Sequence, residues 1–155
     1  MATLKILTDE ALLRRTSRPV DKINQRILTL LDDMVETMRK ANGVGLAAPQ
    51  VGVLRRVVVI EVEEGNVLEL INPEIISRDG TQTGPEGCLS VPGKQGIVER
   101  PEHVVLRALD RDGNLCEYEG EGLMARAMCH ETDHLDGILY TDKAEQMLDE
   151  EEDEE

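Results

Sequence analysis

The segment Cys129–His134, CHETDH, places two histidines four residues apart, with a glutamate directly after the first. On an α-helix this spacing puts both imidazoles on one face, one turn apart, where they can share a metal ion. The adjacent glutamate suits a metal hydrolase, because it can handle the protons of a water molecule while the imidazoles bind the metal. Two ligands do not hold a catalytic metal, so a third must come from elsewhere.

The residues around the two histidines favour a metal site over an ordinary amphipathic helix. Leu123 and Ala127 lie on the same helical stripe as His130 and His134, which directs the histidines toward the interior. Burying two imidazoles side by side without partners costs free energy. We therefore expect a metal ion here, with two ordinary helical histidines as the alternative.

Several residues are candidates for the third ligand. The pattern HExxHxxGxxH fails, because residues 135–141 contain no histidine. Glutamates after residue 141 lie near or within the acidic end of the chain and fit poorly. His103 stands at the entrance of a predicted strand, which is typical of a surface histidine. Cys88 is the better candidate, because the loop Glu86–Ser90 could present a thiolate at fixed geometry, although a lone cysteine is more often a small buried residue.

The other two cysteines are expected to be structural. Cys129 neighbours His130 but points about a third of a turn away on the helix, so it should miss the metal. Cys116 lies in a predicted hairpin strand. Three cysteines in a chain without a secretion signal do not form a disulfide framework.

The segment Gly43–Gln50, GVGLAAPQ, is a glycine-rich loop. It has some likeness to a dinucleotide-binding fingerprint, but that fingerprint follows a strand and opens a helix. This segment follows a predicted helix and contains Pro49, so we reject a dinucleotide site. The glycines would instead let a substrate backbone approach closely, and Gln50 offers an amide donor.

The composition indicates an acidic protein with a single domain. The 155-residue chain has a formal charge of −15, and the seven acidic residues 149–155 supply seven of those negatives, which leaves −8 for the rest. This charge argues against binding to DNA phosphates. We expect one catalytic domain over residues 1–148 and a solvated, disordered acidic tail over 149–155. The chain has no apolar run of membrane-spanning length and no signal-peptide pattern at its start, so we expect a cytoplasmic protein.

The hydrophobic patterns predict an α+β fold. A helix capped by Asp21 should end at Asn42-Gly43, and a second helix over residues 122–137 should carry the HExxH motif. Two hairpins are predicted, one joining Arg56–Val62 to Val67–Ile71 and one joining Val104–Leu109 to Leu115–Glu119. The expected architecture is an N-terminal helix, mostly antiparallel short-stranded sheets, and a C-terminal helix with the metal motif.

Three segments together closely resemble the signature motifs of the peptide deformylase family: Gly43–Gln50, Glu86–Ser90 (EGCLS) and His130–His134 (HETDH). Their order and separations match that family. The similarity continues through LINPEI, GPEGCLSVPGK, ALDRDG and HLDGILY and so covers nearly the whole chain. It implies a hydrolase that removes the N-formyl group from the N-terminal formylmethionine of newly made polypeptides.

The resemblance also implies a role for each matching residue. Cys88, His130 and His134 would bind one divalent metal ion, and Glu131 would transfer protons. Gln50 and the backbone N–H of Leu89 would stabilise the oxyanion. The substrate-binding positions would be Val44, Gly45, Leu123, Arg126 and Ala127. The native metal would be Fe²⁺, with Zn²⁺, Ni²⁺ or Co²⁺ able to occupy the same ligands, and the partners would be formylmethionyl nascent peptides and the ribosome exit region.

Two other functions are compatible with a histidine pair on a helix. A general metallopeptidase would need a wider groove and would cleave internal peptide bonds. A binding protein with a structural metal would need a fourth protein ligand, and none is apparent in the sequence.

Overall fold

The computed structural model describes residues 2–149 of the chain, and it has the predicted α+β architecture. The helices are α1 (Glu10–Leu13), α2 (Gln25–Lys40) and α3 (Leu123–Leu135), with short 3-10 helices η1 (Ala48–Val51) and η2 (Tyr140–Asp142). The strands are β1 (Gly45–Ala47), β2 (Val57–Ile60), β3 (Leu68–Asp79), β4 (Gln82–Cys88), β5 (Val91–Arg100), β6 (His103–Leu109), β7 (Leu115–Glu121) and β8 (Ala144–Asp149). No helix in this described part is long and apolar enough to span a membrane.

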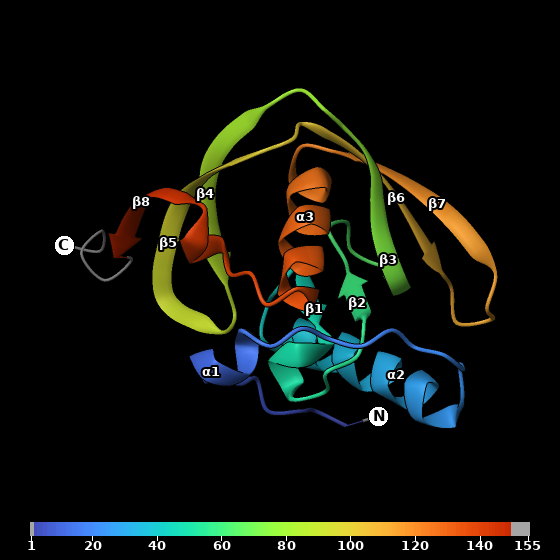
Figure 1. The fold of residues 1–155 in the computed structure, drawn as a ribbon. Coiled ribbons are helices and arrows are strands. Elements are labelled where there is room, and N and C mark those ends of the chain that lie inside the picture. The colour runs from blue at the N-terminus through green and yellow to red at the C-terminus, as the bar shows by residue number, and fades with distance from the viewer. Residues whose placement is uncertain (1, 150–155) are drawn as a thin grey trace.

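The strands form two antiparallel sheets on either side of α3 (Figure 1). The five-stranded sheet has the order β1-β2-β3-β6-β7, and the three-stranded sheet has the order β4-β5-β8. Strand β1 is therefore an edge strand that is paired on one side with β2. Both predicted hairpins are confirmed, because β2 pairs with β3 and β6 pairs with β7.

Strand β2 explains how the core is built. Its sequence VVVI is buried on both faces, which is why it reads as a continuous apolar run rather than as an alternating one. Val58 and Ile60 pack with apolar residues of α3, whereas Val57 and Val59 pack with apolar residues of α2. Each fully buried aliphatic side chain of this kind contributes about 1.5–3 kcal/mol. The helix that carries the two histidines is thus held on a rigid sheet.

The predicted cap of the first long helix was wrong. The N-cap is Asn24, whose Oδ1 accepts a hydrogen bond from the Ile27 N–H at 3.2 Å, and Asp21 lies outside the helix. Both Asn and Asp are good N-cap residues. The first helical turn here follows Asn24 rather than Asp21. The predicted end at Asn42-Gly43 is confirmed: Asn42 has φ 58°, and the Gly43 N–H bonds the Met38 carbonyl at 3.0 Å.

The N-terminal segment closes over the C-terminal end of α3. The Ser17 N–H donates to the Leu135 carbonyl at 2.8 Å, and Arg56 Nη1 donates to the same oxygen at 3.1 Å. Gly137, with φ 74°, lies so close that a Cβ there would stand 2.2 Å from the Arg14 carbonyl oxygen. These contacts satisfy helix-end carbonyls that would otherwise be unpaired.

The C-terminal boundary differs slightly from the expectation. Strand β8 pairs with β5 through Asp149, which lies opposite Lys94, so the ordered unit reaches one residue beyond the expected 1–148. The first residue of the expected 149–155 tail is therefore part of a sheet. The remaining tail residues, 150–155, lie outside the described residues.

Candidate metal centre and substrate pocket

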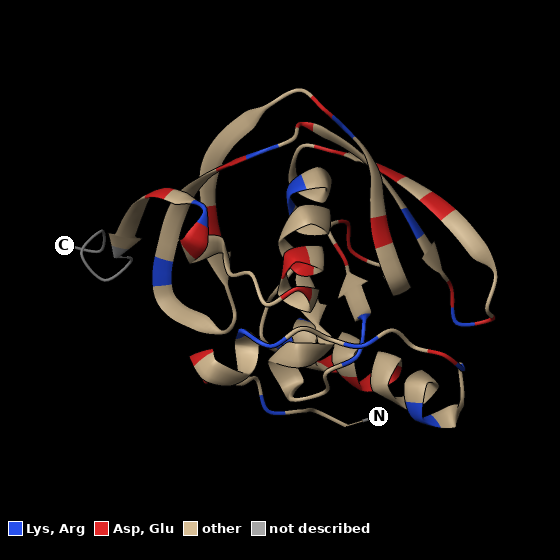
Figure 2. Cartoon of the chain, in the orientation of Figure 1, with Lys and Arg blue, Asp and Glu red and all other residues tan. Residues whose placement is uncertain are grey.

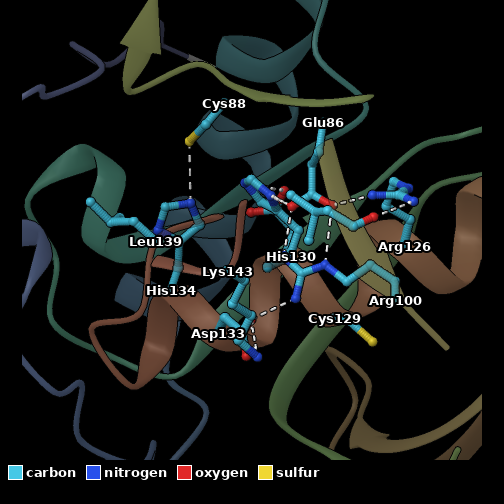
Figure 3. A network of polar contacts seen from close by, with 12 residues as sticks. Glu86, Cys88, Arg100, Arg126, Cys129, His130, Asp133, His134, Leu139 and Lys143 are labelled. Carbon is cyan, nitrogen blue, oxygen red and sulfur yellow. Dashed lines mark hydrogen bonds and ion pairs between the residues drawn. The ribbon is translucent and has the colours of Figure 1, made fainter. Parts of the chain in front are cut away.

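The structure brings Cys88, His130 and His134 together. Cys88 is the last residue of β4, and the two histidines lie one turn apart on α3 (Figure 3). The ligand atoms of these three residues all lie within 4.8 Å of one another, and Cys88 Sγ is 3.3 Å from His134 Nε2. A thiolate and two imidazoles form a donor set that suits iron or zinc and leaves room for a further ligand. The residues present therefore fit a divalent metal ion.

The segment that carries Cys88 is not the loop expected from the sequence. Glu86 to Cys88 belong to β4, and Leu89 and Ser90 form the turn into β5. The β4–β5 ladder shifts its register between Glu86 and Cys88, and Cys88 lies opposite Val91. The prolines and glycines of this segment, which excluded a helix, are compatible with a distorted hairpin.

Glu86 is a buried partner of the site that the sequence analysis missed. Its Oε2 accepts a hydrogen bond from His130 Nδ1 at 2.5 Å and another from Arg100 Nη2 at 2.6 Å. Its Oε1 accepts from Arg126 Nη1 at 2.8 Å (Figure 3). A glutamate two residues before a candidate ligand was the available signal, but only the fold shows that His130, Arg100 and Arg126 converge on it.

The Glu86 network determines how His130 faces the centre. Because Nδ1 is hydrogen-bonded to Glu86, the Nε2 atom of His130 is the one available to a metal. Burial alone would raise the pKa of Glu86, but the hydrogen bonds from His130 and Arg100 outweigh it and hold that pKa well below its usual range. Glu86 is therefore a permanent carboxylate, and it fixes the orientation of the ring.

The second histidine is held in its neutral form. His134 is buried, and burial, together with the nearby His130, lowers its pKa well below the ordinary value. A neutral imidazole is the form that binds a metal. Its Nδ1 atom has no hydrogen-bond partner among the described residues. The Nε2 atom, 3.3 Å from Cys88 Sγ, is the ring nitrogen that faces another candidate ligand.

Glu131 lies beside the three candidate ligands rather than among them. Its side chain is buried, its Oε2 is 4.0 Å from His130 Nε2, and its Oε1 has no hydrogen-bond partner among the described residues. Burial raises the pKa of Glu131 to about 7. A carboxyl group that changes protonation near neutral pH can both accept and return a proton. A Cβ at Gly45 would lie 2.6 Å from Glu131 Oε2, so only glycine leaves room for this carboxylate.

The glycine-rich segment is more ordered than expected. The predicted loop Gly43–Gln50 contains β1 and the beginning of η1, and Gln50 is buried. Gln50 Oε1 accepts a hydrogen bond from the Ala47 N–H at 2.9 Å, which orients the amide. The Nε2 group is then directed toward the turn after β4, 3.1 Å from Ser90 Oγ and 3.5 Å from Cys88 Sγ. Gln50 therefore presents an N–H donor beside the candidate centre.

A cavity of about 380 Å³ opens beside the three candidate ligands. Its lining includes most of the residues predicted for the site: Val44, Gly45, Gln50, Cys88, Leu89, Leu123, Arg126, Ala127, His130 and Glu131. Val44 and Leu123 are partly exposed at 39% and 51%, so their apolar surface is available to a ligand. The Arg126 guanidinium in this lining donates to Glu86 and to the Val98 carbonyl.

The remaining histidine and cysteines lie elsewhere. His103, at the start of β6, contacts Glu119 at 2.8 Å and Asp79 at 3.7 Å on the five-stranded sheet. Cys129 packs in the apolar core between α3 and that sheet. Cys116 lies on β7, 3.7 Å from Asp110 Oδ2. None of these three belongs to the cluster of possible metal ligands in residues 2–149.

Comparisons with known proteins point to one protein family. Residues 3–150 match the family model described as polypeptide deformylase. The chain is 62% identical over 135 residues to a peptide deformylase from Alkaliphilus metalliredigens, covering 87% of this chain and 91% of the relative. It is 56% identical over 153 residues to one from Caldicellulosiruptor bescii, covering 98% and 92%.

Solved structures give the same result for the fold. A peptide deformylase crystal structure from Legionella pneumophila superposes with a TM-score of 0.89 at 44% identity, covering 92% of this chain and 86% of that one. The enzyme from Thermotoga maritima also gives a TM-score of 0.89, at 36% identity, with 93% and 99% covered.

Proposed function

Because the chain belongs to the peptide deformylase family, a family of metal-dependent hydrolases, we propose that Cys88, His130 and His134 hold the metal that it uses to remove N-formyl groups. The substrate is the N-terminal formylmethionine of new polypeptides. The observation that carries the proposal is the approach of one thiol and two imidazoles to within 4.8 Å, beside a cavity and a buried glutamate.

The metal is proposed to be Fe²⁺, with Zn²⁺, Ni²⁺ and Co²⁺ able to occupy the same three donors. When bound, such an ion lowers the pKa of water toward neutrality and polarises a carbonyl oxygen. The protein positions its donors through Glu86, which orients His130, and through the β4–β5 hairpin, which carries Cys88. Elemental analysis of protein purified without oxygen would identify the native ion.

Glu131 is proposed to carry the proton of the reaction. Its carboxylate would accept a proton from the attacking water and deliver it to the amine that leaves when the formyl C–N bond breaks. The raised pKa, about 7, supports both steps near neutral pH. The Gln50 amide and the Leu89 backbone N–H would stabilise the negative oxygen that develops on the formyl carbon, where one lost donor typically costs about 10²–10³ in rate.

The substrate is proposed to bind as an added strand along β1. This strand is at the edge of its sheet, so the Gly45 backbone can pair with an extended peptide. The methionine side chain would then enter the cavity beside Val44, Leu123 and Ala127. Arg126 would shape the wall through its bonds to Glu86 rather than contact the substrate charge.

The natural partners are proposed to be formylmethionyl nascent peptides in the cytoplasm, near the ribosome exit region. A small cavity beside an edge strand favours a chain terminus over an internal segment of a folded protein. DNA is not proposed as a partner, because the net charge of −15 would repel it.

A direct test compares formyl-Met-Ala-Ser with acetyl-Met-Ala-Ser and with an unformylated peptide. We expect formate release from the formyl peptide and no cleavage of internal bonds. A matched series would measure metal content in Cys88→Ser, Cys116→Ser and Cys129→Ser. Only Cys88→Ser should lose metal and activity, because a hydroxyl is a poor replacement for a thiolate. Normal metal and activity in Cys88→Ser would contradict the ligand assignment.

A further inference from the structure

Positive charge is concentrated in the N-terminal third of this acidic protein. Residues 1–56 contain ten Lys and Arg and six Asp and Glu, a formal charge of +4, whereas residues 57–155 contain seven and 26, a charge of −19. Figure 2 shows basic positions along the chain between α1 and α2 and at the start of β2, and mostly acidic positions on β3 and β7. A partner that carries negative charge should therefore be attracted more to this N-terminal third than to the rest of the chain.

A second cavity is lined by residues of this N-terminal third and lies away from the candidate metal centre. It has a volume of about 720 Å³ and shares no lining residue with the substrate cavity. It is bounded by the first turns of α2 and by residues 51–55. Residue 51 is the last residue of η1. Part of its lining is aliphatic, and we call Leu4, Ile27, Leu30 and Leu54 the aliphatic floor.

Three arginines line the same cavity: Arg18, Arg26 and Arg55. We call the cavity with these three side chains the arginine groove. Arg18 and Arg55 are neighbours in a parallel β-bridge, and the Arg18 N–H bonds the Leu54 carbonyl at 3.1 Å. Asp33 also lines the groove, but its Oδ1 accepts a hydrogen bond from the Ala2 N–H at 2.8 Å.

The arginines of the groove differ from most others in the chain. Seven of the twelve arginines lie within 4.0 Å of a carboxylate: Arg14, Arg39, Arg56, Arg100, Arg107, Arg111 and Arg126. Arg18, Arg26 and Arg55 have no such partner in residues 2–149, although acidic side chains are abundant. Three unpaired guanidinium groups over an aliphatic floor match a ligand that combines carboxylates with aliphatic side chains.

We propose that the arginine groove is a docking site for an acidic segment of a partner protein in which leucine-like residues alternate with glutamate or aspartate. Carboxylates would pair with Arg18, Arg26 and Arg55 while the apolar side chains cover the aliphatic floor. A nucleic acid fits less well, because the groove has no aromatic side chain on which bases could stack.

The test uses a fluorescein-labelled peptide, Leu-Glu-Glu-Leu-Leu-Glu-Glu-Leu, with the full chain and with single-residue variants. We expect saturable binding by fluorescence anisotropy, weakened by added salt. Arg18→Gln, Arg26→Gln and Arg55→Gln should each raise Kd by about two- to five-fold, the range expected for an exposed ion pair. Leu54→Ser should also weaken binding through the lost apolar contact.

The matched control is Arg78→Gln, which removes an arginine of β3 that lies outside the groove and also has no ion-pair partner in the described part of the chain. It should leave Kd unchanged, and all variants should keep their turnover of formyl-Met-Ala-Ser. Equal weakening by Arg78→Gln would show general charge attraction and overturn the site. An all-glutamate octapeptide or an oligouridylate that binds as tightly as the mixed peptide would overturn the proposed partner, as would the absence of saturable binding.

Discussion

Among single residues, Glu131 allows metal binding to be separated from chemistry. Glu131→Gln keeps the size of the side chain but cannot accept a proton, so activity on formyl-Met peptides should fall by about 10²–10⁴. Metal content should stay near normal, because the three proposed ligands are untouched. Elemental analysis and kcat/KM measured on the same sample give both quantities. Loss of metal from Glu131→Gln would make this residue a ligand and contradict its proposed role.

Glu86 should act through His130 and through the two arginines that share its carboxylate. Glu86→Gln weakens the hydrogen bond that orients the ring, so metal affinity should fall by about 10–100-fold. It also leaves Arg100 and Arg126 with poorer partners, and the free energy of unfolding should drop by about 1–3 kcal/mol. Metal titration and urea denaturation measure the two effects.

Glu99→Gln provides the matched control for that prediction. Glu99 lies on β5 opposite Thr83, in the same β4–β5 hairpin as Glu86, but its side chain is exposed. Its replacement should leave metal affinity and stability unchanged. An equal loss in both variants would show that the effect comes from net charge rather than from the Glu86 network.

Contacts between neighbouring strands can also be tested, because His103 on β6 contacts residues of both β3 and β7. Its ring contacts Glu119 on β7 and Asp79 on β3, and the hydrogen bond with Glu119 is the main cause of its raised pKa. A raised folded-state pKa stabilises the fold below the unfolded value of about 6.5, and the contribution is lost as the pH rises through the folded value. His103→Gln should therefore destabilise the protein more at about pH 5.5 than at about pH 9.

Urea denaturation of wild type and His103→Gln at the two pH values measures this difference. Glu119→Gln should remove most of the same pH-dependent stabilisation, because it removes the main partner of His103. If the difference in free energy of unfolding between wild type and His103→Gln stays constant with pH, His103 contributes by packing rather than by charge.

The elements were predicted where periodicity or turn chemistry is strong. The two hairpins and the helix that carries the histidines follow from β-branched runs, turn residues and helix formers that agree locally. The short strand β1 was missed, since Gly45–Ala47 has little β propensity and is held in place by pairing with β2. The cap of α2 was predicted at Asp21, whereas the structure has Asn24. The two residue types are equally good caps, so residue type alone does not choose between them.

The candidate site could be predicted as a set of residues but not as a network. Cys88 lies more than 40 positions before the two histidines, and only the resemblance of their motifs, in order and separation, to a known family connected them before the fold was known. The convergence of Arg100 and Arg126 on Glu86 could not be predicted, because these residues come from two strands and a helix that pack only in the folded chain. No local pattern marks such long-range contacts.

The whole molecule should be more stable with its metal than without it. The proposed ligands join β4 to α3, so an ion that binds only the folded chain should raise the free energy of unfolding by about 2.7 kcal/mol at 100 times its Kd. Chelation should therefore lower Tm together with activity, and both should recover when the ion is returned. Cys88→Ser, which lacks one ligand, should show a smaller change in Tm. A chelator that leaves the wild-type Tm unchanged would contradict binding across the two elements.

The closure of the N-terminal segment over α3 affects the order in which the chain matures during synthesis. Ser17 reaches its hydrogen-bond acceptor only after Leu135 exists, and the backbone at Arg14 packs against Gly137. Residues 14–17 must therefore wait for residues 135–137 before they are protected. We expect the Ser17 amide to exchange rapidly with solvent in a fragment that ends at Gly122 and slowly in the 155-residue chain. An enzyme that acts on the first residue of nascent chains would thus gain its own activity only after its helix α3 has been synthesised.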